Sequence, residues 1–299
     1  MDRNEPLLRS DWSIYRGGAI SFANAEACAL EKLFVDQVGG NAIFLSNDNR
    51  RIAIRRTHIA EVGANGVAFV GDTKAVRSVL FEYKERQSLK DLDLIPGPRN
   101  GSFPKDCVVE DSLIERAGRW EKQTPPIEIS VSQDITIRHN SIYDVPRAGI
   151  NVSDGTWGGH IIEYNDVFDT VKETADHGSF NSWGRDRYWG LTDIDANSIT
   201  SGPSRKLPPL NSMKPTILRY NRFRCDNGWD IDLNDGSTNF LIYINLTLHG
   251  GIKLREGFFR NVENNVIVSN SLNAHAWCKG ARTFSATISS SNNTRRSGW

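Results

Sequence analysis

The stretch WDIDLNDGSTNFLIYINLTLHGGIKLREG, residues 229–257, contains one short pattern twice. Residues 230–236 read DIDLNDG and residues 251–257 read GIKLREG, so equivalent positions lie 21 residues apart (257 − 236). Both copies alternate apolar and polar residues as Ile-x-Leu and end in glycine, and alternation with a period of two is typical of a β-strand. A spacing near 20 residues between the copies predicts a solenoid in which successive coils stack equivalent strands on one another.

A second apolar pattern recurs between residues 52 and 267 and interleaves with the first. Isoleucine, leucine or valine recurs in each copy at places that we expect to share one core column, among them Ile54, Ile137, Ile162, Leu218 and Ile242. An asparagine follows at the same place in five copies: Asn140, Asn165, Asn221, Asn245 and Asn265. Asparagine tolerates a left-handed bend, and stacked asparagines form a ladder. The sequence therefore predicts an all-β fold, a parallel β-helix, because the LxxLxLxxN spacing of a leucine-rich repeat is absent.

The repeat sets the expected boundaries along the chain. Residues 1–22 are irregular, residues 23–277 form the predicted β-helix domain, and residues 278–299 form an irregular tail that has lost the strand alternation. Because a β-helix needs capped ends, the lack of a clear cap suggests a truncated chain. Two polar insertions rich in Pro and Gly, residues 72–105 and 185–214, interrupt the coils, and long loops on a rigid scaffold are where binding sites are built.

Composition excludes several classes of protein. The 299 residues carry a net charge of zero, so the bulk charge does not indicate a nucleic-acid partner. Without an 18-residue apolar run we expect no membrane span, and the first residues lack the apolar core of a signal peptide. The protein is therefore either cytoplasmic or lacks the segment that exported it, and we expect a monomer. Four scattered cysteines form no CxxC pair, so we expect free thiols: Cys28, Cys107, Cys225 and Cys278.

Carboxylates gather where the two copies of the first pattern stack. Asp232 should lie over Lys253 and Asp235 over Glu256, with backbones about 4.8 Å apart. Because the isoleucine and leucine of each copy point inward, Asp230 and Asp232 should point outward. Two carboxylates about 5 Å apart suit a retaining glycosidase, so we predict Glu256 as acid/base and Asp235, or as second choice Asp232, as nucleophile. A solvated acidic turn and a calcium site built from the same oxygens are the alternatives.

Cations and aromatic residues lie close to these carboxylates in the repeat register. Lys253 and Arg255 form cross-coil salt bridges or bind sugar hydroxyls or a uronate. Residues 176–189 mix aromatic and polar side chains, as expected of a wall on which sugar rings stack. In register, Trp183 falls in one column with Asp154, Asp235 and Glu256. The predicted substrate-binding residues are His177, Asn181, Trp183, Arg185, Asp186, Asp230, Lys253 and Arg255.

Four stretches carry a resemblance to a known family: residues 141–155, 171–189, 228–239 and 250–260. They resemble bacterial right-handed parallel β-helix proteins of the pectin-lyase-like superfamily, and the likeness extends over roughly residues 20–277. The family has aspartate where this chain has Asn234, and its coils continue further. The resemblance implies a right-handed single-stranded β-helix and a secreted or periplasmic carbohydrate-active enzyme.

Three functions follow from this resemblance and from the carboxylate cluster. The first is a glycoside hydrolase acting on a plant or algal polysaccharide or oligosaccharide, which requires no cofactor. The second is a polysaccharide lyase, in which Lys253 and Arg255 neutralise a uronate and calcium takes part. The third is a sugar-binding or structural β-helix without turnover. The superfamily also includes polygalacturonases, whose motifs the pairs Ile252-Lys253 and Asp176-His177 resemble only faintly, and a fold by itself does not select the reaction.

Overall fold

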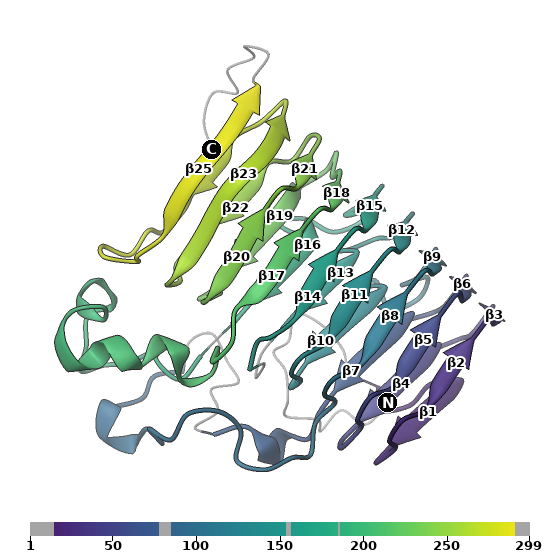
Figure 1. Cartoon of the computed structure of the whole chain (residues 1–299), viewed down its shortest axis with the longest axis horizontal. Coiled ribbons are helices and arrows are strands. Elements are labelled where there is room, and N and C mark those ends of the chain that lie inside the picture. The colour runs from purple at the N-terminus through teal and green to yellow at the C-terminus, as the bar shows by residue number, and fades with distance from the viewer. Residues whose placement is uncertain (1–14, 78–84, 154–156, 185, 291–299) are drawn as a thin grey trace.

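The computed structural model describes residues 15–77, 85–153, 157–184 and 186–290. Short strands stack into a parallel β-helix, with three strands in most coils (Figure 1). One face is a nine-stranded parallel sheet: β1 (Ile20–Ala23), β4 (Ile43–Ser46), β7 (Val67–Val70), β10 (Ile127–Ser130), β13 (Ile150–Val152), β16 (Gly178–Trp183), β19 (Trp229–Asn234), β22 (Ile252–Leu254) and β24 (Leu272–Ala274).

Two further faces complete the coils and meet at the long strand β23 (Arg260–Val268). The first consists of β2 (Ala29–Glu31), β5 (Ala53–Arg55), β8 (Val108–Glu110), β11 (Thr136–Arg138), β14 (Ile161–Glu163), β17 (Thr216–Arg219) and β20 (Phe240–Tyr243). The second consists of β3 (Phe34–Asp36), β6 (His58–Ala60), β9 (Leu113–Glu115), β12 (Ser141–Tyr143), β15 (Asp166–Phe168), β18 (Arg222–Phe223) and β21 (Leu246–Thr247).

The predicted core column is confirmed by the strand register. Ile54 pairs through Val109 with Ile137, and the column continues through Ile162 and Leu218 to Ile242. All of these side chains are fully buried in the main hydrophobic cluster. Removal of the apolar surface of one such column from water is the main stabilising contribution to each coil.

The predicted asparagine ladder is also confirmed. The backbone N–H and the side-chain Nδ2 of Asn140 both donate to the side-chain oxygen Oδ1 of Asn165, at 3.1 and 3.0 Å. The same pair of bonds continues through Asn221 and Asn245 to Asn265. The asparagine itself does not adopt the left-handed conformation. The residue before it does, with positive φ at His139, Tyr164, Tyr220, Ile244 and Asn264. This left-handed residue bends the chain, and the bend directs the side-chain amide of the following asparagine toward the next asparagine of the ladder.

The ladder of strands extends beyond the boundaries expected from the sequence. β1 begins at Ile20 inside the segment expected to be irregular, and β25 (Phe284–Ser290) pairs with β23 inside the expected tail. The tail strand was missed because its short apolar alternation is out of phase with the core, so that Ser285, and not Phe284, pairs with the buried Val262. All four cysteines are free, and within the described ranges no helix is long and apolar enough to cross a membrane.

Candidate functional site

Both insertions leave the β-helix at the same edge of the nine-stranded sheet. The first follows β7 and contains η1 (Thr73–Ala75) and η2 (Leu89–Asp91). The second follows β16 and contains η3 (Ala196–Ser198), η4 (Gly202–Lys206) and η5 (Pro208–Leu210). Both lie on one side of the solenoid, blue and green in Figure 1. Asp235 and Glu256 follow β19 and β22 at this same edge, so the coil topology places the carboxylates beside the insertions.

Buried Arg187 joins the two insertions. Its guanidinium donates to the carbonyls of Asp93 and Ile95 in the first insertion, both at 2.6 Å, and to Asn211 Oδ1 in the second at 2.7 Å. Gln87 adds a second link, because its side-chain amide donates to the carbonyls of Arg187 and Trp189 at 2.9 and 3.1 Å. Charged donors to buried carbonyls are stronger than neutral ones, so the insertions form one packed layer.

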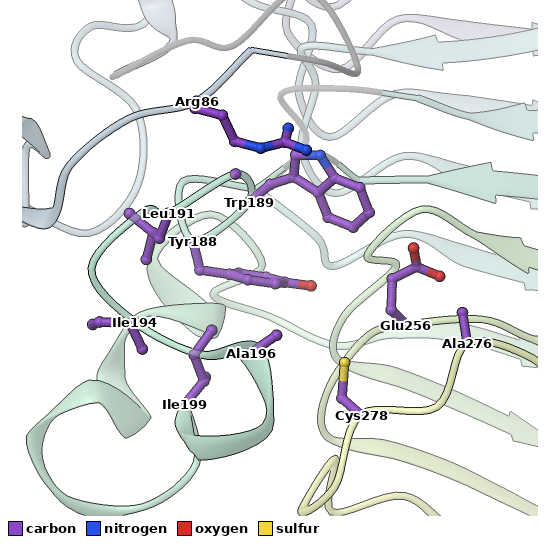
Figure 2. A pocket seen from close by; sticks show the side chains of 11 residues that line it. Arg86, Tyr188, Trp189, Leu191, Ile194, Ala196, Ile199, Glu256, Ala276 and Cys278 are labelled. Carbon is purple, nitrogen blue, oxygen red and sulfur yellow. The ribbon is translucent and has the colours of Figure 1, made fainter.

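A pocket of about 330 Å³ lies between this layer and the end of β22. Figure 2 shows Glu256 on one side of the pocket, facing the aromatic rings of Tyr188 and Trp189, with Arg86 above them. Leu191, Ile194, Ala196, Ile199, Ala276 and Cys278 complete the labelled lining. An apolar pocket with a few polar groups is the usual form of a small-ligand site.

Glu256 shares a cation with Asp235, which lies in the preceding coil. Arg255 Nη1 lies 2.8 Å from Asp235 Oδ1, and Arg255 Nε lies 3.1 Å from Glu256 Oε2. Burial raises the pKa of the Glu256 carboxyl, and the nearby charge of Asp235 raises it further, against Arg255 and a backbone hydrogen bond that lower it. A carboxyl whose pKa is raised by its surroundings suits a general acid.

The turn that holds Asp235 requires glycine after it. Asp235 has a φ of 28° and Gly236 a φ of 85°, the left-handed region. A Cβ atom at residue 236 would lie 2.5 Å from the carbonyl oxygen of Gly184. The close approach brings the end of β16 against the turn after β19, and only glycine allows it.

Asp232 and Lys253 form a second, buried cluster on the nine-stranded sheet. They are register partners, as predicted, and Lys253 Nζ lies 3.1 Å from Asp232 Oδ2 and 2.8 Å from Asp176 Oδ1. Asp232 points outward from the solenoid, but its side chain is 0% exposed. Burial raises the pKa of Asp232 to about 7, against the opposing effect of Lys253.

His177 lies beside this cluster as a neutral hydrogen-bond acceptor. Its Nε2 lies 2.8 Å from Arg147 Nη2, and because a guanidinium only donates, Nε2 accepts. Burial, assisted by the charge of Arg147, lowers the pKa of His177 to about 3. The guanidinium of Arg147 also lies 5.2 Å from the ring of Trp183. The repeat pattern did not identify Arg147, because nothing in its sequence context marks it as buried.

Five predicted substrate-binding residues are covered by protein in this structure, namely Asn181, Trp183, Asp186, Asp230 and Lys253. Trp183 packs in a buried cluster with Phe44 and Trp157 under the first insertion, so its ring is not an exposed stacking surface. Asn181 and Asp186 are also buried. The expectation of an exposed wall overlooked the insertions, whose layer covers this face. Trp183 pairs with Asn234, one position before Asp235, which shifts the predicted column by one residue.

Asp230 has a structural role, because backbone N–H groups bind its carboxylate. Its carboxylate accepts from the backbone N–H groups of Cys225, His249 and Gly251 at 2.7 to 3.0 Å. These three bonds to backbone groups hold the bend that precedes β19. Burial nevertheless raises its pKa to about 6.

Arg185 and Asp154 lie outside the described residues. Within the described ranges, no group of three His, Cys, Asp or Glu side chains is placed to hold a metal ion.

Sequence reasoning missed Arg86 and the lining from residues 191–199 and 276–278. These segments are distant from Glu256 along the chain, and the repeat pattern does not extend into them. Two other missed residues, Glu128 and Asn151, carried a usable signal. They precede Asn181 and Asp232 in one outward column of the register, which alignment of all copies of the first pattern would have revealed.

Comparison with known proteins finds similarity at the level of solved structures. A structure described as a glycoside hydrolase is 13% identical, with a TM-score of 0.49, over 93% of this chain and 38% of that one. The A-module of a mannuronan C-5 epimerase from Azotobacter vinelandii is 11% identical, with a TM-score of 0.42, over 89% of this chain and 55% of that one. This chain thus spans less than two thirds of either. No protein-family model and no curated protein matches the sequence, and these values are too low to transfer an activity.

Proposed function

We propose that the protein is a carbohydrate-active enzyme, a glycoside hydrolase that cleaves a plant or algal polysaccharide or oligosaccharide with two carboxyl groups. One observation carries this proposal. The carboxyl of Glu256 lines the pocket with its pKa raised by burial, and Asp235 shares Arg255 with it from the next coil. Environments that give two adjacent carboxyls different roles are typical of glycosidases.

In this mechanism Glu256 donates its proton to the glycosidic oxygen as the bond to the sugar breaks. Asp235 then acts as the nucleophile, or as the base that activates water, depending on the separation of the two carboxyls. The ring of Trp189, which is partly exposed, offers apolar surface to a sugar ring, and Arg255 holds both carboxyl groups in place. Because the acid acts only while protonated, turnover should fall as the pH rises through the raised pKa of Glu256.

The test measures turnover of aryl glycosides, with the melting temperature measured alongside, for Glu256→Gln and Asp235→Asn. We expect each variant to lose roughly 10²–10⁴ in turnover, the usual contribution of a positioned acid or base. Both carboxyl side chains are largely buried, at 12% and 15% exposed, so loss of either ion pair with Arg255 should also cost about 1–3 kcal/mol of stability. Glu263→Gln, on β23 outside the pocket, is the matched control and should keep full activity. Activity within a few-fold of wild type in both test variants would contradict the assignment.

Uronate polymers form the second arm of the same assay. A polysaccharide lyase would release an unsaturated product that absorbs ultraviolet light, and calcium would increase its rate. The cations assigned to that role, Lys253 and Arg255, are already paired with Asp232 and Asp235. We therefore expect hydrolysis without an unsaturated product. Formation of that product, or sugar binding without any turnover, would overturn the hydrolase proposal.

A further inference from the structure

A column of five polar side chains runs along the outer face of the nine-stranded sheet. The parallel register aligns Glu128 of β10, Asn151 of β13, Asn181 of β16, Asp232 of β19 and Lys253 of β22. All five are at most 2% exposed, although they point away from the solenoid core. Buried polar side chains are normally hydrogen-bonded, so the donors and acceptors of this column can be counted.

The hydrogen bonds in the first half of the column all point the same way. Asn151 Nδ2 donates to Glu128 Oε2 at 2.8 Å, and Asn181 Nδ2 donates to Asn151 Oδ1 at 2.9 Å. Ser153 Oγ donates to the second oxygen of Glu128 at 2.7 Å. Each amide thus directs its NH₂ group toward Glu128, which leaves Asn181 Oδ1 on the side of Asp232.

The next contact of the column, between Asn181 and Asp232, lacks a hydrogen-bond donor. Asp232 Oδ2 accepts from Lys253, but within the described part of the chain neither Asp232 Oδ1 nor Asn181 Oδ1 has a hydrogen-bond partner, and both atoms are buried. These residues are direct register partners, about 4.8 Å apart at the backbone. Two buried acceptors in this arrangement would repel each other and each would lack a hydrogen bond.

Counting donors resolves the conflict. The column has three contacts, from Glu128 to Asn151, from Asn151 to Asn181 and from Asn181 to Asp232. Two amides supply one donor each along the column, and an ionised carboxylate supplies none. Among the side chains of these three contacts, only a carboxyl can supply the third donor, as a proton. We propose that the column holds one buried proton on Asp232, whose Oδ1–H donates to Asn181 Oδ1.

The charges around Asp232 are consistent with a neutral side chain. The facing charged groups are Lys253, Asp176 and Arg255. The ammonium of Lys253 lies closer to Asp176, at 2.8 Å, than to Asp232, at 3.1 Å, so Asp176 pairs with it when Asp232 is neutral. Burial is the largest effect on Asp232 and raises its pKa to about 7. A protonated Asp232 accepts from Lys253 through Oδ2 and donates through Oδ1, which satisfies both oxygens.

This inference assigns Asp232 a positioning role that does not depend on the proposed activity. A neutral carboxyl held by Asn181 and Lys253 is a poor nucleophile, so the chemistry at this edge is left to Asp235 and Glu256. The proton also ties β16 to β19, the two strands whose ends carry the second insertion and the turn of Asp235. The bond therefore orients the strand that leads into the pocket.

Asp232→Asn is the discriminating variant, because an amide can donate to Asn181 and accept from Lys253 as the protonated acid does. We expect this variant to fold with stability at pH 8 equal to or above that of wild type. An ionised Asp232 in a salt bridge predicts the opposite, because removal of one partner of a buried pair strongly destabilises a protein. Asn181→Leu, which breaks the column without altering a charge, should destabilise at every pH.

The pH dependence has a definite sign. The pKa of Asp232 is raised to about 7 in the folded state, so between about pH 4 and pH 7 the native protein binds one more proton than the unfolded chain. Its unfolding constant should therefore rise about tenfold per pH unit across this window, a dependence that Asp232→Asn should remove. Denaturant titrations at several pH values measure both quantities, and the difference between the variants cancels the contribution of Asp230.

Infrared difference spectroscopy locates the proton directly. Wild type at pH 5 should show the C=O stretches of two buried protonated carboxyls, Asp232 and Asp230, whose pKa values are raised to about 7 and about 6, and Asp232→Asn should lose the band of Asp232. Loss of the band together with full stability supports the proposal. If Asp232→Asn is strongly destabilised and keeps the band, the proton resides elsewhere, with Glu128 the next candidate. Absence of the band in wild type at pH 5 would also overturn the proposal, since a bound water could then supply the donor.

Discussion

Replacement of Asn165 by alanine tests how much the asparagine ladder contributes to stability. Asn165 is 2% exposed and occupies a middle position of the ladder. Its Oδ1 accepts from the backbone and the side chain of Asn140, and its Nδ2 donates to the carbonyl of Ile137 and to Asn221 Oδ1. Alanine removes all four of these bonds and leaves the apolar core column beneath unchanged.

The expected loss of stability depends on which hydrogen bonds the partners of Asn165 keep in the variant. The side chain of Asn140 still donates to the carbonyl of Val109, and Asn221 Oδ1 still accepts from the backbone of residue 165. The backbone N–H of Asn140 loses its acceptor, Asn165 Oδ1, and stays buried. One unsatisfied buried donor costs about 1–3 kcal/mol and each further lost bond about 1 kcal/mol, so we expect a loss of roughly 4–6 kcal/mol.

Equilibrium unfolding in urea measures this loss through the midpoint at constant m-value. Far-ultraviolet circular dichroism and tryptophan fluorescence should report the same transition, because a solenoid that splits into separately unfolding blocks would invalidate a single free energy. Asn100→Ala, in an exposed position of the first insertion, is the control and should change stability by less than about 0.5 kcal/mol. A loss below about 1 kcal/mol for Asn165→Ala would refute the reasoning, since the hydrogen bonds of the ladder would then contribute almost nothing to stability.

Two further substitutions test the bend and the insertions. Ile244 is 46% exposed with a φ of 53°, so Ile244→Asn should stabilise by about 1 kcal/mol by relief of left-handed strain, and a lower melting temperature would contradict this. Arg187→Met removes the bonds of Arg187 to both insertions and should make residues 85–105 and 186–214 the first sites of proteolysis, while the urea midpoint of the β-helix changes little. Unchanged cleavage with a large fall in the midpoint would show that Arg187 stabilises the coils instead.

The repeat in the sequence was sufficient by itself to predict the fold. Residues that alternate with a period of two assign each side chain to one face of a strand, and recurrence every 20–25 residues stacks equivalent strands. These are local rules, so Ile137, Asn165 and the pairing of Asp232 with Lys253 lie where the pattern placed them. The tail strand β25 was missed because its alternating residues Phe284 and Ala286 do not take the register positions of the buried core column.

The candidate site depended on the insertions, which no repeat describes. Periodicity places Asp232 and Trp183 on the outer face, but exposure depends on what covers that face. Only the packing of residues 72–77, 85–105 and 186–214, joined through Arg187, shows that these side chains are buried and that Trp189 faces Glu256 across a pocket. Burial then sets the charge state, because desolvation raises the pKa of Asp232 and of Glu256. The direction of a side chain is a local property of the strand, whereas its solvation depends on segments distant in sequence, and that is why tertiary structure alone decided the chemistry.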